Sequence, residues 1–267
     1  MLVRVHVPLA RNAIPYYEYL KKNYRSLCSA GTDLEFYVYS IEGQLPVDAH
    51  KQIVCKTSSG STGHAIALTV LLQEPVTEDI KVIADSDTVM LEHDWDLVLN
   101  TVFKQFERSV VGTSYEPIGG FSSGNSRVQT YKNRATMSWI AIPRALTHVF
   151  TSFDTSAEKQ ENLVISTIEQ SHTYNLPIGY ELLRDACWSL PQFLDTNNIH
   201  DIVLRHAKPS KDALAVKSDN DYNEEYQLNG IPFVGHQRGS MKHPFRGNEI
   251  SKNFYDSIES YLERKPQ

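Results

Sequence analysis

Cysteine is scarce in this chain, whose 267 residues include only Cys28, Cys55 and Cys187. Three cysteines this far apart are too few for a disulfide framework or a zinc site, and we expect reduced, mostly buried thiols. Long apolar runs are also lacking. No stretch approaches the roughly 18 apolar residues of a membrane helix, and the apolar run at the start is too short for a signal peptide. The sequence therefore predicts a soluble, cytoplasmic protein with no transmembrane segment.

An excess of positive charge is lacking as well. Lysine and arginine number 26 against 32 aspartates and glutamates, for a net charge of -6. This balance gives no electrostatic footprint for nucleic acid or an anionic membrane over the whole surface. Hydrophobic residues make up 41% and charged residues 22%, as in ordinary soluble globular proteins. A chain of this length forms one large domain or two small ones around a sizeable core.

The most informative stretch is residues 81–91, with the sequence KVIADSDTVML. Its short apolar run predicts a buried strand that ends at two carboxylates, Asp85 and Asp87. Alternate side chains of an extended strand point to the same face, so the two acids are expected to lie together. Adjacent carboxylates repel each other unless a cation lies between them, and hard oxygen ligands suit Mg2+ or Mn2+. An Asp-rich turn at a strand end is the alternative.

The rest of the sequence alternates between strand-like and helix-like patterns. We expect strands at residues 2–7, 34–40, 52–55, 109–114 and 135–142, and helices at 14–27, 65–72, 97–106, 144–150, 157–170 and 248–262. Pro8 is expected to end the first strand. Asp94 or Asp96 is expected to favour the N-terminus of the third helix rather than bind metal. The polar residues 217–225 predict a loop or surface excursion.

A run rich in glycine and serine, residues 58–64, precedes the helix at 65–72. Small residues such as Gly63 at a helix N-terminus let a ligand approach closely, and His64 lies beside it. The run has neither the Lys-Ser/Thr of a P-loop nor the spacing of a dinucleotide fingerprint. A plainly capped helix is the alternative.

A second stretch with candidate catalytic residues is residues 180–191. If it is helical, Glu181 and Asp185 lie on one face at positions i and i+4. Without a partner between them, such a pair is mildly unfavourable. A solvated helix face with Arg184 nearby is the alternative.

A third stretch, residues 231–247, is punctuated by glycine and gathers basic side chains around a histidine. His236 lies near Arg238, Lys242 and Arg246 in the sequence, and such cations are suited to phosphate oxygens. A lone histidine is more often a satisfied structural residue, which is the alternative here.

The order of these features resembles the GT-A family of nucleotide-sugar glycosyltransferases. The features are strand–helix–strand, a Gly-Ser-rich helix start, a strand ending in Asp-Ser-Asp, and a late histidine; the resemblance covers about residues 2–247. It implies an α/β fold with a mixed, mostly parallel central sheet flanked by helices. It also implies a single domain, with a nucleotide-sugar-binding half at about 1–110, an acceptor half at about 111–247 and a C-terminal helix at 248–267.

In that family the D-x-D motif holds a divalent cation on the donor's diphosphate, and Asp85 and Asp87 match it. The resemblance thus implies Mn2+ or Mg2+ as cofactor and a UDP- or GDP-sugar as donor. A late histidine often supplies a third ligand, for which His236 matches best and His243 second. The metal and cationic side chains would stabilise the charge that develops on the leaving diphosphate. The residues assigned to the donor are Val7, Pro8, Arg11, Tyr39, Ser40, Gly63, His64, Ser86, Arg238, Ser240 and Lys242.

Inverting members of the family carry a carboxylate base on a helix in the second half. Asp185, three residues before Trp188, matches that position, and Glu181 is the alternative base. A retaining enzyme would need no such base. Trp139, Trp188 and His243 are assigned to the acceptor, which is left open among a glycan, a lipid-linked glycan, a protein and a nucleic acid.

Two other classes of protein compete with this interpretation. The Asp85-x-Asp87-x-Val89 pattern also fits haloacid-dehalogenase-type phosphatases, in which the first aspartate attacks phosphorus. That family places the motif near its N-terminus and carries a later Gly-Asp-x-x-x-Asp motif, which this sequence lacks. Sugar nucleotidyltransferases need a Gly-rich, Arg-containing loop after the first strand, and residues 8–12 are not that loop. A protein that binds a sugar or metal without catalysis stays open.

Overall fold

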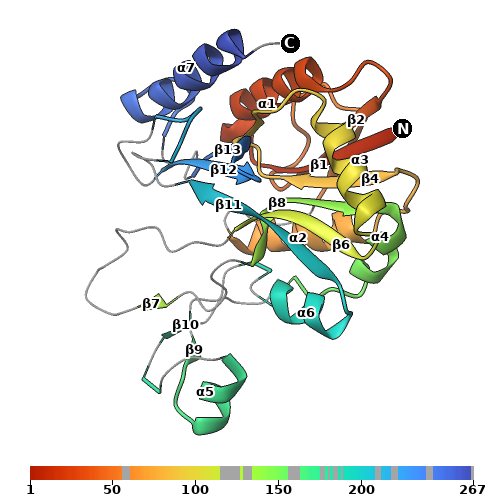
Figure 1. Cartoon of the computed structure of the whole chain (residues 1–267), viewed down its shortest axis with the longest axis vertical. Coiled ribbons are helices and arrows are strands. Elements are labelled where there is room, and N and C mark those ends of the chain that lie inside the picture. The colour runs from red at the N-terminus through yellow and green to blue at the C-terminus, as the bar shows by residue number, and fades with distance from the viewer. Residues whose placement is uncertain are drawn as a thin grey trace.

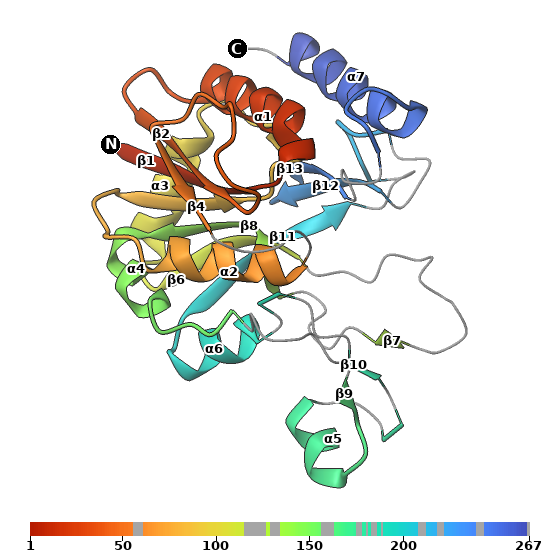
Figure 2. The same ribbon diagram turned by 180° about the vertical axis from the view of Figure 1, so that it is seen from behind.

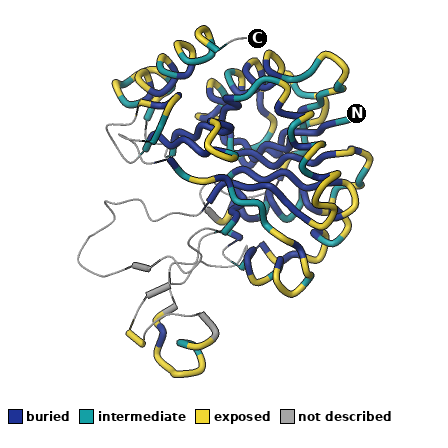
Figure 3. Tube along the Cα trace, in the orientation of Figure 1, coloured by how far each residue is buried: buried dark blue, intermediate teal, exposed yellow. Residues whose placement is uncertain are grey.

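The computed structural model describes residues 1–55, 61–114, 127–128, 134–155, 163–174, 178–179, 181–182, 186–187, 189–207, 212–217, 222–238 and 243–265. A ten-stranded sheet forms its centre, in the order β3-β2-β1-β4-β8-β6-β11-β12-β13-β5. Helices flank the sheet on both sides (Figures 1 and 2), and the buried residues concentrate in its strands (Figure 3). The α/β class and the mixed central sheet are therefore as predicted.

The strands of the large sheet are β1 (Leu2–Leu9), β2 (Asp33–Ser40), β3 (Lys51–Val54), β4 (Ile80–Ala84), β5 (Thr88–Met90), β6 (Ser109–Ser114), β8 (Ala135–Pro143), β11 (His200–Ala207), β12 (Asn223–Leu228) and β13 (Ile231–Gln237). The helices are α1 (Ile14–Leu27), α2 (Ser61–Leu72), α3 (Trp95–Gln105), α4 (Arg144–Phe150), α5 (Ile168–Tyr174), α6 (Leu190–Thr196) and α7 (Glu249–Arg264), with a 3-10 turn at Arg11–Ala13. None of the described helices has the length and apolar character needed to cross a membrane.

The sheet is parallel in one half and mixed in the other. Strands β3, β2, β1 and β4 pair in parallel, which places their carboxyl ends at one edge. Strand β8 lies antiparallel between β4 and β6, and β11 pairs in parallel with β6. Strands β12, β13 and β5 complete the sheet by antiparallel pairing. This last pairing brings β13, which is late in the sequence, against the segment that follows β4.

The side chains of β1 alternate between the two faces of the large sheet. Val3, Val5 and Val7 pack with α1 and α3 in one core cluster, whereas residues between them face the α2 side. A second cluster joins that side of the sheet to α2, α4 and α6. The core therefore consists of two layers, one on each face of the sheet.

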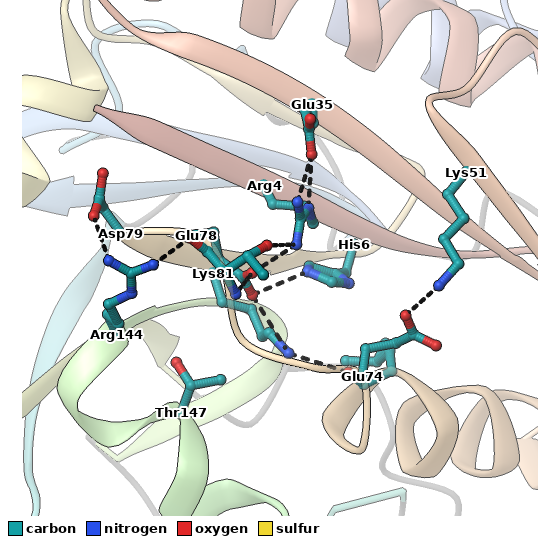
Figure 4. Close-up of polar contacts among 12 residues, drawn as sticks. Arg4, His6, Glu35, Lys51, Glu74, Glu78, Asp79, Lys81, Arg144 and Thr147 are labelled. Atoms are coloured by element: carbon teal, nitrogen blue, oxygen red, sulfur yellow. Dashed lines mark hydrogen bonds and ion pairs between the residues drawn. The ribbon is translucent and has the colours of Figure 1, made fainter.

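A buried polar network lies on the α2 face, between β1 and β4 (Figure 4). The Glu78 carboxylate lies 2.7 Å from Arg4 Nη1, 3.6 Å from His6 Nε2 and 3.5 Å from Lys81 Nζ. The side chains of Glu78, His6 and Lys81 are fully buried. Buried charges are tolerated when they are paired, so this network explains why polar residues alternate with valines in these strands.

Two sequence-based boundaries differ from the structure. β1 continues through Pro8 to Leu9. Proline has no backbone N–H, but β4 pairs with β1 only from Val3 to His6, so Pro8 interrupts no hydrogen bond to β4. The helix predicted at 157–170 is wrong at residues 163–164, which form a strand, and α5 begins at Ile168.

A small sheet stands apart from the large one. Its strands are β7 (Arg127–Val128), β9 (Leu163–Val164) and β10 (Glu181–Leu182), in the order β7-β10-β9. Together with α5 it projects from one end of the ten-stranded sheet (Figures 1 and 2). The helix considered at residues 180–191 is therefore not formed at Glu181, which lies in a strand, while residues 180, 183–185 and 188 lie outside the described part of the chain. The two-residue pairing with β7 and β9 determines this conformation.

Candidate metal centre

The two aspartates of the D-x-D motif lie in a turn between β4 and β5. β4 ends at Ala84 and β5 begins at Thr88, so the expected extended strand through Asp87 is not formed. The Asp85 carbonyl accepts hydrogen bonds from Thr88 N at 3.1 Å and Thr88 Oγ1 at 2.8 Å. The chain thus reverses just where the carboxylates occur, and the turn rather than strand alternation brings them together.

Pairing between β13 and β5 brings a histidine to this turn. His236 lies opposite Thr88 in the strand register, and Gln237 N donates to the Asp87 carbonyl at 3.1 Å. His236 Nε2 lies 3.3 Å from Asp87 Oδ1 and 4.0 Å from Asp85 Oδ2. One ligand atom from each of Asp85, Asp87 and His236 falls within 4.8 Å of the others. The three predicted metal-binding residues therefore converge at one point.

Carboxylates lie close to both ring nitrogens of His236. Burial lowers the pKa of His236, but the carboxylates of Asp87 and Glu224 outweigh burial and raise it to about 10. In the chain alone, the proton on His236 supplies the positive charge between these acids. Two carboxylates and an imidazole nitrogen are ligands that Mn2+ accepts, and Mg2+ accepts their oxygens. The donor set fits a divalent metal ion.

Three residues assigned to the donor surround this centre. His64, in the first turn of α2, places Nε2 3.6 Å from Asp85 Oδ1, with its side chain 31% exposed. Ser86, between the aspartates, is mostly buried, at 8% exposure. Arg238 follows β13 directly, and its Nε donates to Glu224 Oε2 at 2.7 Å. Gly63 is buried in α2. The start of α2 thus lies beside the D-x-D motif, while the predicted roles of Gly63 and His64 in donor binding stay predictions.

The other donor-site predictions concern the ends of β1 and β2. Val7 and Pro8 lie within β1, are buried and pair with β2, so neither side chain is open to a ligand. Tyr39 is also fully buried, with its hydroxyl 2.8 Å from His6 Nδ1. The ring of Tyr39 is therefore not open to a donor. Ser40 Oγ donates to the Gly43 carbonyl. Arg11 is exposed at the end of β1.

The acceptor assignment of Trp139 is wrong. The indole is fully buried, lies edge-on to Phe233 and donates its N–H to Tyr24 Oη at 2.9 Å. β8 lies between two strands and is covered on both faces, so none of its side chains offers an open ring to a sugar. His243, the second choice for a metal ligand, is not part of the three-residue group. Its Nδ1 lies 3.0 Å from Asn248 Nδ2.

Several assigned residues lie outside the described part of the chain. Asp185, Trp188, Ser240 and Lys242 belong to this group. Glu181 is described only as part of β10. Their proposed roles therefore stay predictions.

Sequence analysis missed one residue of the centre, Glu224. Residues 217–225 predicted a surface excursion, yet from Asn223 the chain enters β12 and is buried. Burial raises the pKa of Glu224, but the charges of Arg238 and His236 overcome it and lower the pKa to about 2. Nothing in the polar run indicates burial, because the partners that make it tolerable lie on another strand.

Comparisons with known proteins complete this description. No family model matches the chain, and no curated protein matches it in sequence. Among solved structures, the chain is similar to S. aureus TarS 1-349, at 15% identity over 68% of this chain and 58% of that one, with a TM-score of 0.38. It is also similar to the mannosyltransferase PcManGT from Pyrobaculum calidifontis in complex with GDP-Man and Mn2+, at 17% identity over 68% of this chain and 53% of that one, with a TM-score of 0.40. The chain thus spans less than two thirds of the length of each.

Proposed function

We propose that this chain is a metal-dependent glycosyltransferase that moves a sugar, a hexose in particular, from a UDP- or GDP-sugar to an acceptor hydroxyl. The observation that carries the proposal is the convergence of Asp85, Asp87 and His236 within 4.8 Å. Two carboxylates held this close, with an imidazole facing them, form a site for a divalent cation. Its position after β4, at the carboxyl edge of the parallel strands, is where α/β sheets bind ligands.

Asp85, Asp87 and His236 would hold Mn2+ or Mg2+, which when bound supplies positive charge to a leaving nucleoside diphosphate. The protein's own cations would complete that environment. His64 lies 3.6 Å from Asp85 Oδ1, and Arg238 borders His236 through Glu224. We propose that both side chains contact the donor's phosphate oxygens, for which such cations are suited.

The acceptor side rests on the sequence. We propose that residues 1–110 form the donor half and 111–247 the acceptor half, with Asp185 as the base that takes the acceptor's proton in an inverting transfer. Glu181 is the alternative base. A cytoplasmic setting is proposed from the scarcity of cysteine, of which the 267 residues include three, since disulfide frameworks are typical of secreted proteins.

The test is hydrolysis of the donor. Purified protein is incubated with Mn2+ or Mg2+ and a panel of UDP- and GDP-sugars, and release of the nucleoside diphosphate is measured with and without EDTA. We expect slow release from one donor that EDTA abolishes. A matched pair of variants, Asp87→Ala at the centre and Asp256→Ala on the exposed side of α7, ties the activity to the site.

Two further assays separate the competing functions. Release of inorganic phosphate from a phosphomonoester, lost in Asp85→Asn, would support the phosphatase alternative. Donor and Mn2+ binding by calorimetry without turnover toward any acceptor would support a binding protein. Absence of both binding and release would contradict the proposal.

A further inference from the structure

The residue opposite His236 in the sheet is a buried glutamate. Glu224 of β12 pairs with His236 of β13 in the antiparallel register, so the two side chains project from the same face. Glu224 is 3% exposed. A carboxylate in such a position is retained only with strong partners, because an unpaired buried charge is costly.

Three groups meet at one oxygen of this carboxylate. Glu224 Oε2 accepts from Arg238 Nε at 2.7 Å and from the Tyr226 hydroxyl at 2.8 Å. His236 Nδ1 lies 3.3 Å from the same atom. The hydroxyl and the guanidinium hold the carboxylate from two directions, which fixes it against the imidazole.

This arrangement gives the two ring nitrogens of His236 different surroundings. Nδ1 faces Glu224, whereas Nε2 faces Asp87 at 3.3 Å and Asp85 at 4.0 Å. A carboxylate at Nδ1 keeps a proton on that nitrogen and leaves the Nε2 lone pair for a metal ion. The same carboxylate holds the guanidinium of Arg238 at the edge of the centre.

We propose that Glu224 is a positioning residue that sets the orientation and tautomer of His236 for metal binding and anchors Arg238 beside it. This inference rests on the proposed metal-dependent function. Glu224 would thus influence metal affinity through His236, without being a metal ligand itself. Partners of this kind typically change metal affinity by about 10- to 100-fold.

The next residue on the strand provides a matched control. Glu225 is also buried, but it faces the opposite side and accepts from the backbone N–H groups of Ala215 and Val216 at 2.7 and 3.0 Å. Loss of its charge would weaken the same strand without touching His236. A purely structural role for Glu224 would therefore make Glu224→Gln and Glu225→Gln behave alike.

The experiment is calorimetric titration of the full chain with MnCl2, after circular dichroism has shown that each variant is folded. We expect Glu224→Gln to bind Mn2+ about 10- to 100-fold more weakly than wild type, and Glu225→Gln to bind within about twofold of it. Glu224→Asp keeps the negative charge but shortens the side chain by one methylene, which withdraws the carboxylate oxygen from both Nδ1 of His236 and Nε of Arg238. This variant is also expected to bind Mn2+ more weakly than wild type. If Glu224→Gln does not fold, the Mn2+ affinity of Glu224→Asp tests the role of Glu224 instead.

The outcomes separate this inference from the function on which it rests. No Mn2+ binding by wild type would overturn the metal site and the proposed function together. Wild-type binding that is unchanged in folded Glu224→Gln or Glu224→Asp would overturn the role of Glu224 alone. Equal weakening in Glu224→Gln and Glu225→Gln would also overturn it, since it would show a general effect of strand stability.

Discussion

The indole N–H of Trp139 in β8 donates to the hydroxyl of Tyr24 in α1 over 2.9 Å. That hydroxyl lies 3.1 Å from Thr88 Oγ1, which in turn donates to the Asp85 carbonyl at 2.8 Å. Each hydroxyl has one hydrogen to donate and the Asp85 carbonyl only accepts, so the direction of this series of hydrogen bonds is fixed: Trp139 to Tyr24, Tyr24 to Thr88, and Thr88 to Asp85. The turn that carries the D-x-D motif is thus anchored to the core through a fully buried tyrosine.

Replacement of Tyr24 by phenylalanine should destabilise the protein by about 1–3 kcal/mol, because the buried Trp139 N–H would lose its acceptor. Tyr17→Phe is the control. Its hydroxyl donates to the Asp48 carbonyl at 3.0 Å in a less buried position, so its loss should cost about 1 kcal/mol or less. Urea unfolding of both variants measures the difference. Equal destabilisation of the two variants would show that the buried hydrogen bonds of Tyr24 stabilise the protein no more than the hydrogen bond of Tyr17 does.

Asp87→Ala should abolish metal-dependent donor binding. The substitution removes a ligand rather than an outer partner, so the affinity for Mn2+ should fall by more than the roughly 100-fold upper range for outer-shell changes. Calorimetry with Mn2+, alone and with UDP or GDP, measures this. Asp256→Ala should match wild type. Wild-type affinity for metal and donor in Asp87→Ala would refute the assignment of the centre.

Asp185→Asn should separate binding from transfer. The amide cannot take the acceptor's proton, so transfer should fall by roughly 100- to 10,000-fold, as for loss of general-base catalysis. Binding of the donor and metal should survive. Glu181→Gln tests the alternative base in the same transfer and calorimetric assays. Undiminished transfer in Asp185→Asn would remove this residue as the base.

His6 should make stability depend on pH. Burial, with smaller contributions from Lys81 and Arg4, lowers the pKa of His6 to about 4 despite the neighbouring Glu78, whereas the unfolded chain titrates near 6.5. Between these values the unfolded state binds a proton that the folded state does not. Stability is therefore lost as the pH falls from about 6.5 to 4, by up to about 3 kcal/mol.

The measurement is the free energy of unfolding in urea at several values of pH between 7 and 4. His6→Gln should be less stable at pH 7 but should show a shallower decline with acidification. His200→Gln is the control, because that histidine is exposed in β11. The same slope in wild type and His6→Gln would contradict a buried neutral imidazole.

Local patterns predicted those elements whose two faces differ. The helix at 14–27 was predicted with the bounds of α1, since its apolar residues recur at helical spacing and pack on one side. The strands at 34–40 and 109–114 also lie within a residue of β2 and β6. The helix at 157–170 was wrong at residues 163–164, because β9 pairs there with β10, about 18 residues later in the sequence, and it agrees with the structure only at 168–170, where α5 begins.

Some residues of the candidate metal centre were likewise predicted from the sequence, and others were not. Asp85 and Asp87 stand out in the sequence because two acids follow an apolar strand, and His236 was found by resemblance. The sequence did not predict which aromatic side chains are exposed to a ligand. Trp139 and Tyr39 lie in strands covered on both faces, where no alternation distinguishes a buried ring from one open to a ligand.

The sequence by itself determined the strand that leads to the D-x-D motif and the identity of its two acids, because hydrophobic period and residue chemistry are local properties. The class of fold and the third candidate ligand, His236, came from the resemblance of the sequence to a known family. Only the tertiary structure decided that these ligands converge, since the antiparallel register of β13 on β5 brings His236 to the turn. It alone placed Glu224 behind His236. A charged residue in a polar run becomes a buried one only when distant strands provide its partners, and that pairing leaves no mark on the local pattern.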